Sequence, residues 1–557
     1  MPGLFILCTR PQMVRKTFIR IYRMVLKNLQ DENAIHLAVY DGNKNGVPPE
    51  PLAREFPPEV WRDFSRNVAM PFSEANVVDV DGREVRLHEV IEEQLQLIAN
   101  TNHLTVQDLA KSIGSYNYSR IDIRALEKLF NEMTHECANT YLQKVIPNMA
   151  ELALAAKTLF KQPIPFLKAN QNGSVTMSQQ QCASLLANAF FCTFPDHLYP
   201  NDRLYEYNCF YFWRLFRRDI QSTVEKLKCL LYYFKQVTTS MPCGTVTFLR
   251  HETNATAQKF ASSEQLLTEM KVDDTEKIEN QTGLAHVDFA NEFIGGGVFE
   301  GGCVQEEIRF SICPEMLVSC LICERMRDNE AILIIGAERY SDYNGYGRTF
   351  RWKRKEGVNS KDVQRDPFGH AYSELIAIDA VFFDNHRLNT QFDFECINRE
   401  IIKAYAGFSI MTNQSFVGIA TGNWGCGAFN GNPQLKSLLQ LIAASEAGRP
   451  LHYYTFGSHE FSNQLMNVLK LLYEKNYTVG SLHKLITTYA QVKSNLSTPL
   501  FSFIERELGS KNAPASHDQQ SSEVRTNSSN GEPAPKKMNT IQSTLTSWLK
   551  KEDNSES

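Results

Sequence analysis

The chain of 557 residues has little of what marks membrane proteins or nucleic-acid-binding proteins. It contains no uninterrupted apolar run of about 18 residues, so no transmembrane helix and no membrane partner are expected. Its net charge of −5 shows no basic excess, and a polyanionic ligand would therefore have to be met by local groups. A hydrophobic content of 43% still allows a large buried core.

The cysteine spacing argues against a disulfide framework. The 13 cysteines are odd in number and follow no repeating spacing, which is typical of a protein in a reducing compartment. Cys320 and Cys323 form a single CxxC pair, without the second pair or the histidines that a zinc site requires. A buried structural role is expected for both, and neither a metal site nor a cofactor is expected in the chain.

The first thirty residues contain six basic residues and no acid. Such a composition occurs in organelle-targeting peptides, but this segment lacks the serine that those peptides usually contain. A surface helix is the preferred interpretation, and targeting is the alternative. The expected location is the nucleus, the cytoplasm or both, with an organelle as the less favoured option.

Changes in composition divide the chain into four parts. Residues 1–60 form an N-terminal extension, and residues 509–557 form a polar tail that is expected to be disordered. Residues 61–240 show apolar residues at three- and four-residue spacing, which predicts a mainly helical accessory domain. The clearest helical runs are 87–101, 122–146, 178–194 and 224–238.

Residues 241–508 alternate between apolar strand-like runs and helical runs. Such alternation is typical of an α/β domain whose strands lie in a largely buried, mixed or parallel sheet. The strands are expected at 244–250, 285–290, 331–337, 349–354, 375–383, 415–421 and 451–456, and the helices at 398–408, 433–447, 459–474 and 480–492.

Five glycines lie within residues 295–302, after the strand-like run that contains Asp288. Glycine loses the most backbone entropy on folding, so this density indicates a loop that approaches a ligand closely or adopts positive φ. Exposed N–H groups in such a loop can form a nest for phosphate oxygens. Two familiar phosphate loops are excluded, because the dinucleotide fingerprint would need glycine at Glu300 and a P-loop would need lysine after Gly302.

Two adjacent carboxylates, Glu306 and Glu307, follow this loop. Adjacent side chains diverge by about 100° on a helix, so they cannot flank one bond like the paired acids of most glycosidases. One can donate a proton while the other holds a ligand hydroxyl; the alternative is two acids that only complement a helix N-terminus. Asp288 is likewise either a cap or turn group or, together with Asn291, a contact to a nucleotide.

Aromatic residues near two other glycine-rich stretches are candidate ligand contacts. Tyr340, Tyr343 and Tyr346 recur every three residues, and they either cover a base or sugar or simply pack. The segment 421–429 follows a strand and precedes a helix, which makes it a second candidate phosphate site. Phe429 and Phe456 follow expected strands, where open α/β sheets bind ligands; core positions are the alternative.

The three glycines at 295–297, followed after a short spacer by Gln305-Glu306-Glu307, resemble the signature of the poly(ADP-ribose) glycohydrolase family. VDFAN, YSDYNGY, AIDA, ATGNWGCGAF and FFCTFP are also similar to that family, and the similarity covers residues 60–490. The resemblance implies a macrodomain-like α/β/α core with a mixed sheet, preceded by a helical accessory domain. It also implies hydrolysis of the ribose–ribose O-glycosidic bonds of poly(ADP-ribose), which releases ADP-ribose.

The resemblance implies a role for each matching residue. Glu307 would be the general acid and base, Glu306 would bind a ribose hydroxyl, and Asp288 would be the third acidic site residue. Glu307 must be protonated to assist the leaving hydroxyl, and its carboxylate can then activate water. The implied substrate contacts are Asn291 and Gln305, Gly296 and Gly297 against the diphosphate, Tyr346 over the ligand, Phe429 near the distal ribose and Phe456 against adenine.

Poly(ADP-ribose) and ADP-ribosylated proteins are the implied partners, and a monomer is the expected state. Two alternatives to an active hydrolase stay open: a reader that binds ADP-ribose without cleaving it, and a scaffold recruited through its tail. One amphipathic motif in the tail resembles the box by which replication and repair proteins bind the DNA sliding clamp. Its anchors are Gln542, Leu545, Trp548 and Leu549.

Overall fold

The computed structural model describes most of the chain between residues 33 and 509. The basic N-terminal segment and the sliding-clamp motif at 542–549 lie outside the described residues. These are 33–42, 46–54, 56–117, 121–199, 206–356, 363–412, 414, 416–492 and 498–509.

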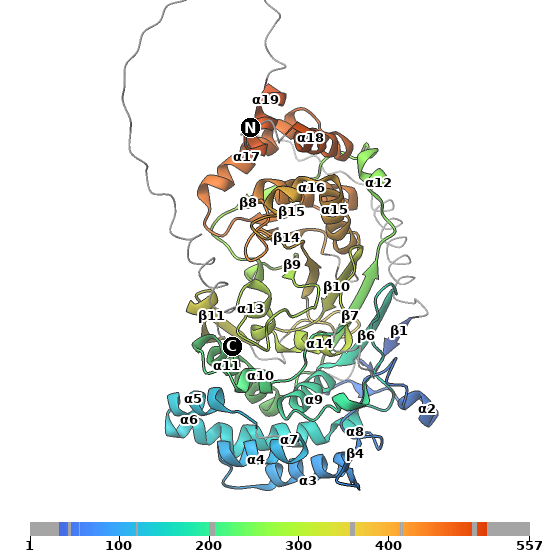
Figure 1. Ribbon diagram of the computed structural model, residues 1–557, viewed down its shortest axis with the longest axis vertical. Helices are drawn as coiled ribbons and strands as arrows, with labels where there is room; N and C mark the ends of the chain where they lie inside the picture. The colour runs from blue at the N-terminus through green and yellow to red at the C-terminus, as the bar shows by residue number, and fades with distance from the viewer. Residues whose placement is uncertain are drawn as a thin grey trace, which may run out of the picture.

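The centre of the molecule is a nine-stranded mixed sheet with the order β1-β6-β7-β10-β13-β9-β14-β15-β8 (Figure 1). The five strands from β13 to β8 are parallel, whereas β10 is antiparallel to both of its neighbours. The strands are β1 (Ala34–His36), β6 (Gly173–Ser178), β7 (Thr245–Glu252), β8 (Met270–Asp273), β9 (Ala285–Ala290), β10 (Glu330–Ile335), β13 (Glu374–Asp379), β14 (Ile419–Gly422) and β15 (Leu451–Tyr454).

The carboxyl ends of β9, β14 and β15 lie at one edge of the sheet, because these three strands are parallel. The loop with five glycines leaves β9 at this edge, and the second glycine-rich stretch leaves β14. Phe456 follows the end of β15. Parallel strands thus bring three distant segments of the chain into one region, as is common in α/β sheets that bind ligands.

Alternation along the central strands separates two hydrophobic cores. In β10, Ile332 and Ile334 belong to the core shared with the helical region, whereas Ala331 and Leu333 belong to the opposite one. Successive side chains of a strand point to opposite faces of a sheet, so helices must cover both faces. The predicted α/β/α core is confirmed.

Helices from different parts of the chain cover the two faces (Figure 1). On the first face lie α9 (Gln179–Phe190), α11 (Gln221–Thr239), α13 (Gln305–Ile312) and α14 (Val318–Ile322). The opposite face carries α12 (Ala257–Ala261), α15 (Phe394–Phe408), α16 (Pro433–Ala447), α17 (His459–Glu474), α18 (Val479–Val492) and α19 (Leu500–Gly509).

The helical region extends beyond the first face. Its helices are α2 (Pro58–Trp61), α3 (Leu87–Asn100), α4 (Val106–Asn117), α5 (Arg124–Glu132), α6 (His135–Thr140), α7 (Ile146–Leu154), α8 (Ala156–Leu159) and α10 (Trp213–Phe216). Small two-stranded ribbons pair β2 (Ala38–Val39) with β3 (Glu50–Pro51), β4 (Val77–Val80) with β5 (Arg83–Arg86), and β11 (Ser341–Asn344) with β12 (Arg351–Arg354).

The sheet crosses the division predicted between residues 240 and 241. Both β1 and β6 precede this division, yet β1 pairs with β6 and β6 pairs with β7 in the main sheet. The core between the sheet and α9 also continues into α3, α4 and α7. The helical region and the sheet therefore share one hydrophobic core, and residues assigned to the N-terminal extension supply an edge strand.

Two local expectations differ from the structure. The helical run at 122–146 is divided into α5, α6, a π-helical turn and the start of α7. The hydroxyl of Thr134 starts a new helix by accepting a hydrogen bond from the Cys137 N–H at 3.3 Å. The expected strand at 349–354 forms only the small ribbon of β11 and β12, outside the main sheet.

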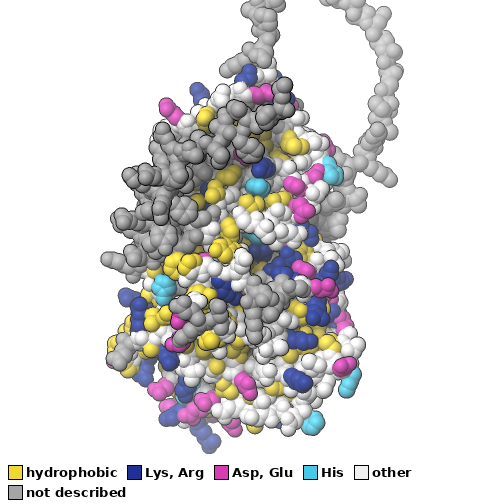
Figure 2. Space-filling model, turned by 180° about the vertical axis from the view of Figure 1, so that it is seen from behind, with side chains coloured by type: hydrophobic (Ala, Val, Ile, Leu, Met, Phe, Trp, Pro, Cys, Tyr) yellow, Lys and Arg dark blue, Asp and Glu magenta, His cyan; other side chains and the backbone are white. Residues whose placement is uncertain are grey.

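No helix among the described residues combines the length and apolar character needed to cross a membrane. On the face shown in Figure 2, basic side chains gather across the middle, while acidic and basic side chains are interspersed below. The surface therefore offers local positive charge in spite of a net charge of −5.

Candidate active site

Helix α13 begins directly after the glycine loop and carries Glu306 and Glu307 in its first turn. Acidic residues are favourable there because they complement the positive end of the helix dipole. Both are nevertheless buried, with 2% exposure for Glu306 and 6% for Glu307. Glutamates are almost never this buried without specific partners, so the two are more than surface acids at a helix N-terminus.

Glu307 is oriented by two backbone N–H groups. Its Oε1 accepts a hydrogen bond from Gly297 at 3.0 Å, and its Oε2 accepts one from Val304 at 2.7 Å. An ionised carboxylate has about four lone-pair sites. Each oxygen therefore keeps a lone pair with which it can take up a proton or contact a ligand.

Glu306 is held in the same way, by the N–H of Gly295 at 2.6 Å and that of Asn291 at 2.9 Å. Asp288 lies beside it within β9, fully buried, and neither of its oxygens receives a donor from the described residues. Burial, then the charge of Glu307, raises the pKa of Asp288; burial, then the charge of Asp288, raises the pKa of Glu306. The two neighbouring carboxyls thus lie in a buried site that favours their protonated forms.

Gly296 lies against both glutamates with φ +50°. A Cβ at this position would lie 2.6 Å from Glu306 Oε2 and 2.7 Å from Glu307 Oε1, too close for any side chain. Gly296 thus lies against both carboxylates, although the two glutamate side chains leave the helix in different directions. Glycine is required here by backbone conformation and by space.

Several N–H groups of the loop are already bonded within the protein. Gly295 and Gly297 donate to the two glutamates, while Gly296 and Val298 donate to the carbonyls of Phe293 and Gly295, each at 3.0 Å. These four N–H groups are therefore not free to form a phosphate nest. Contact of Gly296 and Gly297 with a diphosphate stays a prediction, which would rely on the space left by their missing side chains.

Asn291 and Gln305 differ in what their side chains can offer a ligand. Asn291 Oδ1 accepts a hydrogen bond from Phe293 at 3.0 Å, and its Nδ2 has no acceptor within the described part of the chain. Gln305 instead ties α13 to β9, since Oε1 accepts from Phe289 at 2.9 Å and Nε2 donates to the Val287 carbonyl at 3.2 Å. Ligand contact stays a prediction for both residues.

The three tyrosines at 340–346 have separate roles. Tyr340 is buried and donates to Glu315 at 2.7 Å, and the Tyr343 hydroxyl donates to Glu279. Tyr346 is 56% exposed as a whole, but burial of its hydroxyl, followed by the charge of Glu307, raises its pKa. Tyr346 is therefore the one that lies beside the glutamates.

Phe456 and Phe429 lie at the same edge of the sheet. Phe456 is 46% exposed with φ +53°, and its ring meets that of Phe289 edge-on, with centroids 6.4 Å apart. Phe429 is partly buried and packs edge-on against Phe382 at 5.9 Å. An exposed ring on a backbone conformation that is unfavourable for bulky residues indicates a functional position for Phe456.

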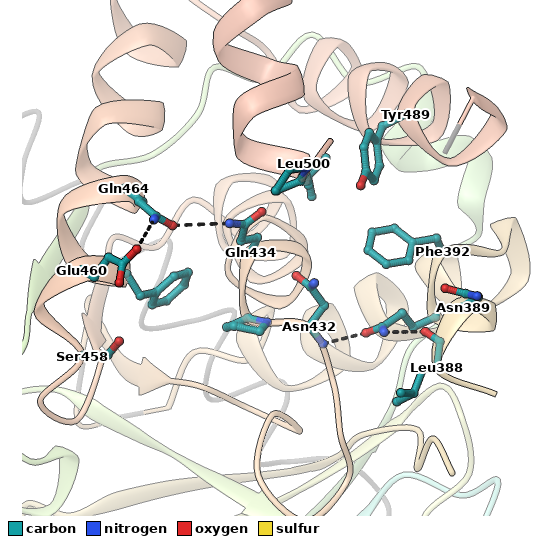
Figure 3. Close-up of a pocket in the computed structure, with 14 residues that line it drawn as sticks. Leu388, Asn389, Phe392, Asn432, Gln434, Ser458, Glu460, Gln464, Tyr489 and Leu500 are labelled. Atoms are coloured by element: carbon teal, nitrogen blue, oxygen red, sulfur yellow. Dashed lines mark hydrogen bonds between the residues drawn. The ribbon is translucent and has the colours of Figure 1, made fainter. Parts of the chain in front are cut away.

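A separate cavity of about 500 Å³ opens between the start of α16, the start of α17, and helices α18 and α19 (Figure 3). Its polar side chains bond to one another: Gln434 donates to Gln464 at 3.4 Å, and Gln464 donates to Glu460 at 3.1 Å. None of the predicted site residues lines this cavity. The candidate active site is therefore the carboxylate cluster at the glycine loop.

Two residues of the helical region contact the glycine loop and were not predicted from the sequence. Lys226 of α11 and Asn208 donate hydrogen bonds to carbonyl oxygens of the loop. A buried lysine in an amphipathic helix has the same sequence pattern as a surface lysine. The sequence therefore contained no signal for this contact.

Comparison with known proteins accounts for both the sheet and the helical region. Residues 257–463 match the family model described as poly(ADP-ribose) glycohydrolase, macro domain fold, and residues 133–250 match the helical domain of the same family. Poly(ADP-ribose) glycohydrolase 2 of Caenorhabditis elegans is 32% identical over 76% of this chain and 86% of its own length. The chain belongs to the poly(ADP-ribose) glycohydrolase family. The carboxylate cluster, Tyr346, Phe429 and Phe456 all lie within the macro domain match.

Two further members of the poly(ADP-ribose) glycohydrolase family show the extent of the similarity. Poly(ADP-ribose) glycohydrolase 1 of Caenorhabditis elegans is 36% identical over 69% of this chain, which spans about half, 49%, of that relative. Poly(ADP-ribose) glycohydrolase 1 of Arabidopsis thaliana is 32% identical over 69% of this chain and 85% of its own length. The resemblance seen in the sequence motifs is thereby confirmed.

Proposed function

We propose that this chain hydrolyses the ribose–ribose O-glycosidic bonds of poly(ADP-ribose) and releases ADP-ribose, with Glu307 as general acid and base. Membership in the poly(ADP-ribose) glycohydrolase family supports the substrate and the reaction. The position of Glu307 supports its role: the side chain is buried, oriented by two backbone N–H groups and adjacent to the hydroxyl of Tyr346.

The reaction takes two steps. In the first, protonated Glu307 gives its proton to the leaving ribose oxygen while the bond from that oxygen to the anomeric carbon breaks, which leaves an oxocarbenium-like centre. In the second, the Glu307 carboxylate takes a proton from water while the water oxygen bonds to the anomeric carbon. The acid is regenerated, and one ADP-ribose is released with a hydroxyl at that carbon.

The neighbouring residues assist in different ways. The raised pKa of Asp288 favours its uncharged form beside Glu307, and free lone pairs on Glu306 can accept a hydrogen bond from a ribose hydroxyl. The exposed rings of Tyr346 and Phe456 are available to cover the sugar and stack on adenine. The Asn291 Nδ2 can donate to the ligand.

Cleavage of labelled poly(ADP-ribose) by the wild type and by Glu307→Gln tests this proposal. Loss of a general acid and base typically costs about 10²–10⁴-fold in rate, so Glu307→Gln should release almost no ADP-ribose while still binding the polymer. Glu300→Gln is the matched control, because Glu300 is an acid of the same loop that only pairs with Arg214 and Arg218 at the surface. Intact polymer after incubation with the wild type would refute the proposed activity.

A non-hydrolysing reader of ADP-ribose is the second candidate. Binding alone needs the aromatic rings but no proton donor, whereas Glu306 and Glu307 are both present and buried here. Polymer that is bound by the wild type yet never cleaved would favour the reader.

We also propose, from the sequence alone, that the tail binds the DNA sliding clamp through Gln542, Leu545, Trp548 and Leu549, and that the protein is a monomer of the nucleus, the cytoplasm or both. These four residues lie outside the described part of the chain. Calorimetry with a peptide of residues 538–552 tests the clamp contact, and absence of heat would end this proposal. Sedimentation of the tagged full chain tests the monomeric state, and imaging of the same chain tests its location in the cell.

A further inference from the structure

The carbonyl oxygens of the glycine loop are held by side chains of the helical region. Asn208 Nδ2 donates to two of them, and the ammonium group of Lys226 donates to four. Lys226 lies in α11 and Asn208 precedes α10; Figure 1 shows these two helices below α13. The loop is therefore bonded to the two glutamates on one side and to the helical region on the other.

The contact of Asn208 with Ile294 bears directly on Glu306. Asn208 Nδ2 lies 2.9 Å from the carbonyl oxygen of Ile294. In a planar trans peptide unit, this carbonyl and the N–H of the next residue point in opposite directions. Holding the Ile294 carbonyl toward Asn208 therefore turns the Gly295 N–H toward Glu306 Oε1, which it reaches at 2.6 Å.

The same geometry applies two residues further along the loop, where the N–H group faces Glu307. Asn208 Nδ2 also lies 3.0 Å from the carbonyl oxygen of Gly296. The N–H of the following residue, Gly297, points the other way and reaches Glu307 Oε1 at 3.0 Å. The Asn208 amide thus aims one of the two N–H groups that bond to each of the adjacent carboxylates.

Lys226 holds the second half of the loop. This side chain is 1% exposed, and its charge is stabilised by carbonyl oxygens, which replace the water that burial removes. The loop is too tight to tolerate a change in path, since a Cβ on Gly302 would lie 3.0 Å from Gly297 Cα. The carbonyl partners of Lys226 Nζ are Gly297 at 3.4 Å, Val298 at 2.8 Å, Glu300 at 2.6 Å and Gly302 at 2.8 Å.

We propose that Asn208 and Lys226 are positioning residues for hydrolysis, which hold the loop carbonyls so that the loop N–H groups stay aimed at Glu306 and Glu307. This inference rests on the proposed function. It gives the helical region a part in the reaction: the region sets the geometry of the acid and base without contacting the substrate. A role limited to stabilising the fold is the alternative.

Asn208→Leu, which has a similar size but no donor, separates these two roles. The matched control is Asn188→Leu, because Asn188 also donates to two carbonyls, of Ala153 at 3.1 Å and Ser184 at 2.9 Å, within the helical region. A misplaced catalytic group costs about 10²-fold, so kcat of Asn208→Leu should fall by about that factor while KM changes little. Equal kcat for the two variants, corrected for the folded fraction, would overturn the proposal.

The pH profile provides a readout that fold stabilisation does not change. Removing the aimed N–H donors favours the protonated carboxyls, and the first step needs a protonated acid, so the alkaline limb of kcat/KM should move to higher pH in Asn208→Leu and stay in place in Asn188→Leu. Lys226→Met should shift this limb in the same direction. Its control is Lys403→Met, a lysine with no exposure that donates to the carbonyl of Arg327 instead of to a carbonyl of the loop. An unshifted limb in both loop variants would contradict the proposal.

Hydrogen–deuterium exchange of the loop peptide distinguishes failure of this inference from failure of the proposed function. If the wild type leaves poly(ADP-ribose) intact, the proposed function fails, and the loop geometry is judged by exchange alone. Faster exchange at Gly295 and Gly297 in Asn208→Leu than in Asn188→Leu supports the orientation of the loop by Asn208. Equal exchange in both variants overturns it.

Discussion

Two glycine-rich loops leave the same edge of the sheet, and each has a buried lysine beside it. The first, 295–302, is held through its carbonyls by Lys226 and Asn208, which belong to another region of the chain. The second, 422–431, closes on its own backbone, for example by a hydrogen bond from Gly431 N–H to the Gly425 carbonyl at 2.8 Å.

The lysine of the second loop has different partners. Lys436 of α16 pairs with Glu400 and lies 4.1 Å from the centre of the Trp424 ring, so it supports side chains rather than loop carbonyls. In addition, Gln440 Nε2 donates to the Gly422 carbonyl and the Phe383 N–H donates to the Phe429 carbonyl, each at 3.1 Å. The second loop is thus held within the α/β domain, whereas the first also depends on the helical region.

The largest effect is expected from a single methyl group in the first loop. Gly296→Ala would place Cβ 2.6 Å from Glu306 and 2.7 Å from Glu307, so the glutamates must move, and hydrolysis should fall by about 10³-fold. Gly427→Ala in the second loop is the control, since no atom lies within 4 Å of its Cβ. Polymer cleavage rates measure both; similar rates for the two variants would remove the distinction between the loops.

The second prediction concerns how the free energy of unfolding changes with pH because of Lys226, the buried lysine beside the first loop. Burial lowers the pKa of Lys226 to about 8, so the unfolded chain binds more protons than the folded one from pH 8 up to the ordinary lysine pKa of about 10.4. The free energy of unfolding of the wild type should therefore rise with pH in this window, relative to Lys226→Met, by up to about 3 kcal/mol. Urea unfolding at a series of pH values measures this difference. A difference between the wild type and Lys226→Met that stays constant with pH would contradict the prediction.

The third prediction concerns the aromatic residue beside the second loop. Stacking of a base on an aromatic ring is worth about 1–3 kcal/mol, so Phe456→Ala should weaken ADP-ribose binding by about tenfold or more, with little change in kcat. Phe456→Tyr keeps the ring and should bind like the wild type. Calorimetry with ADP-ribose gives the affinities; an unchanged affinity in Phe456→Ala would leave the ring without a ligand role.

The smallest effect is a pH dependence at Asp288. Its raised pKa means that the folded chain keeps a proton that the unfolded chain loses near pH 4. This contribution to stability is complete at low pH and is lost as the pH rises through the folded pKa. Asp288→Asn removes this titration, so the unfolding free energy of the wild type should fall relative to that of Asp288→Asn by about 1 kcal/mol or more as the pH rises toward neutral. A difference that stays constant with pH in urea unfolding would argue against the raised pKa of Asp288.

The sequence by itself determined most strands of the central sheet, the family and the candidate site. Apolar runs such as 331–337 and 375–383 are read directly as buried strands, because their hydrophobic pattern is local. Gly295–Gly297 and Gln305–Glu307 are likewise contiguous, so the acidic residues and the family could be recognised without coordinates. The short strands β1, β6 and β8 have weak hydrophobic patterns and could not be predicted from the sequence.

Only the tertiary structure decided how the glycine loop is used. The pairing of Gly295 and Gly297 N–H groups with the two glutamates closes part of what looked like an open anion nest. The carbonyl contacts of Asn208 and Lys226 span 71 to 88 positions in the chain, and no local pattern encodes such a distance. Backbone hydrogen bonds depend on which groups folding brings together, and that is the physical reason why the sequence reveals the two adjacent glutamates but not Asn208 and Lys226, which contact the loop beside them.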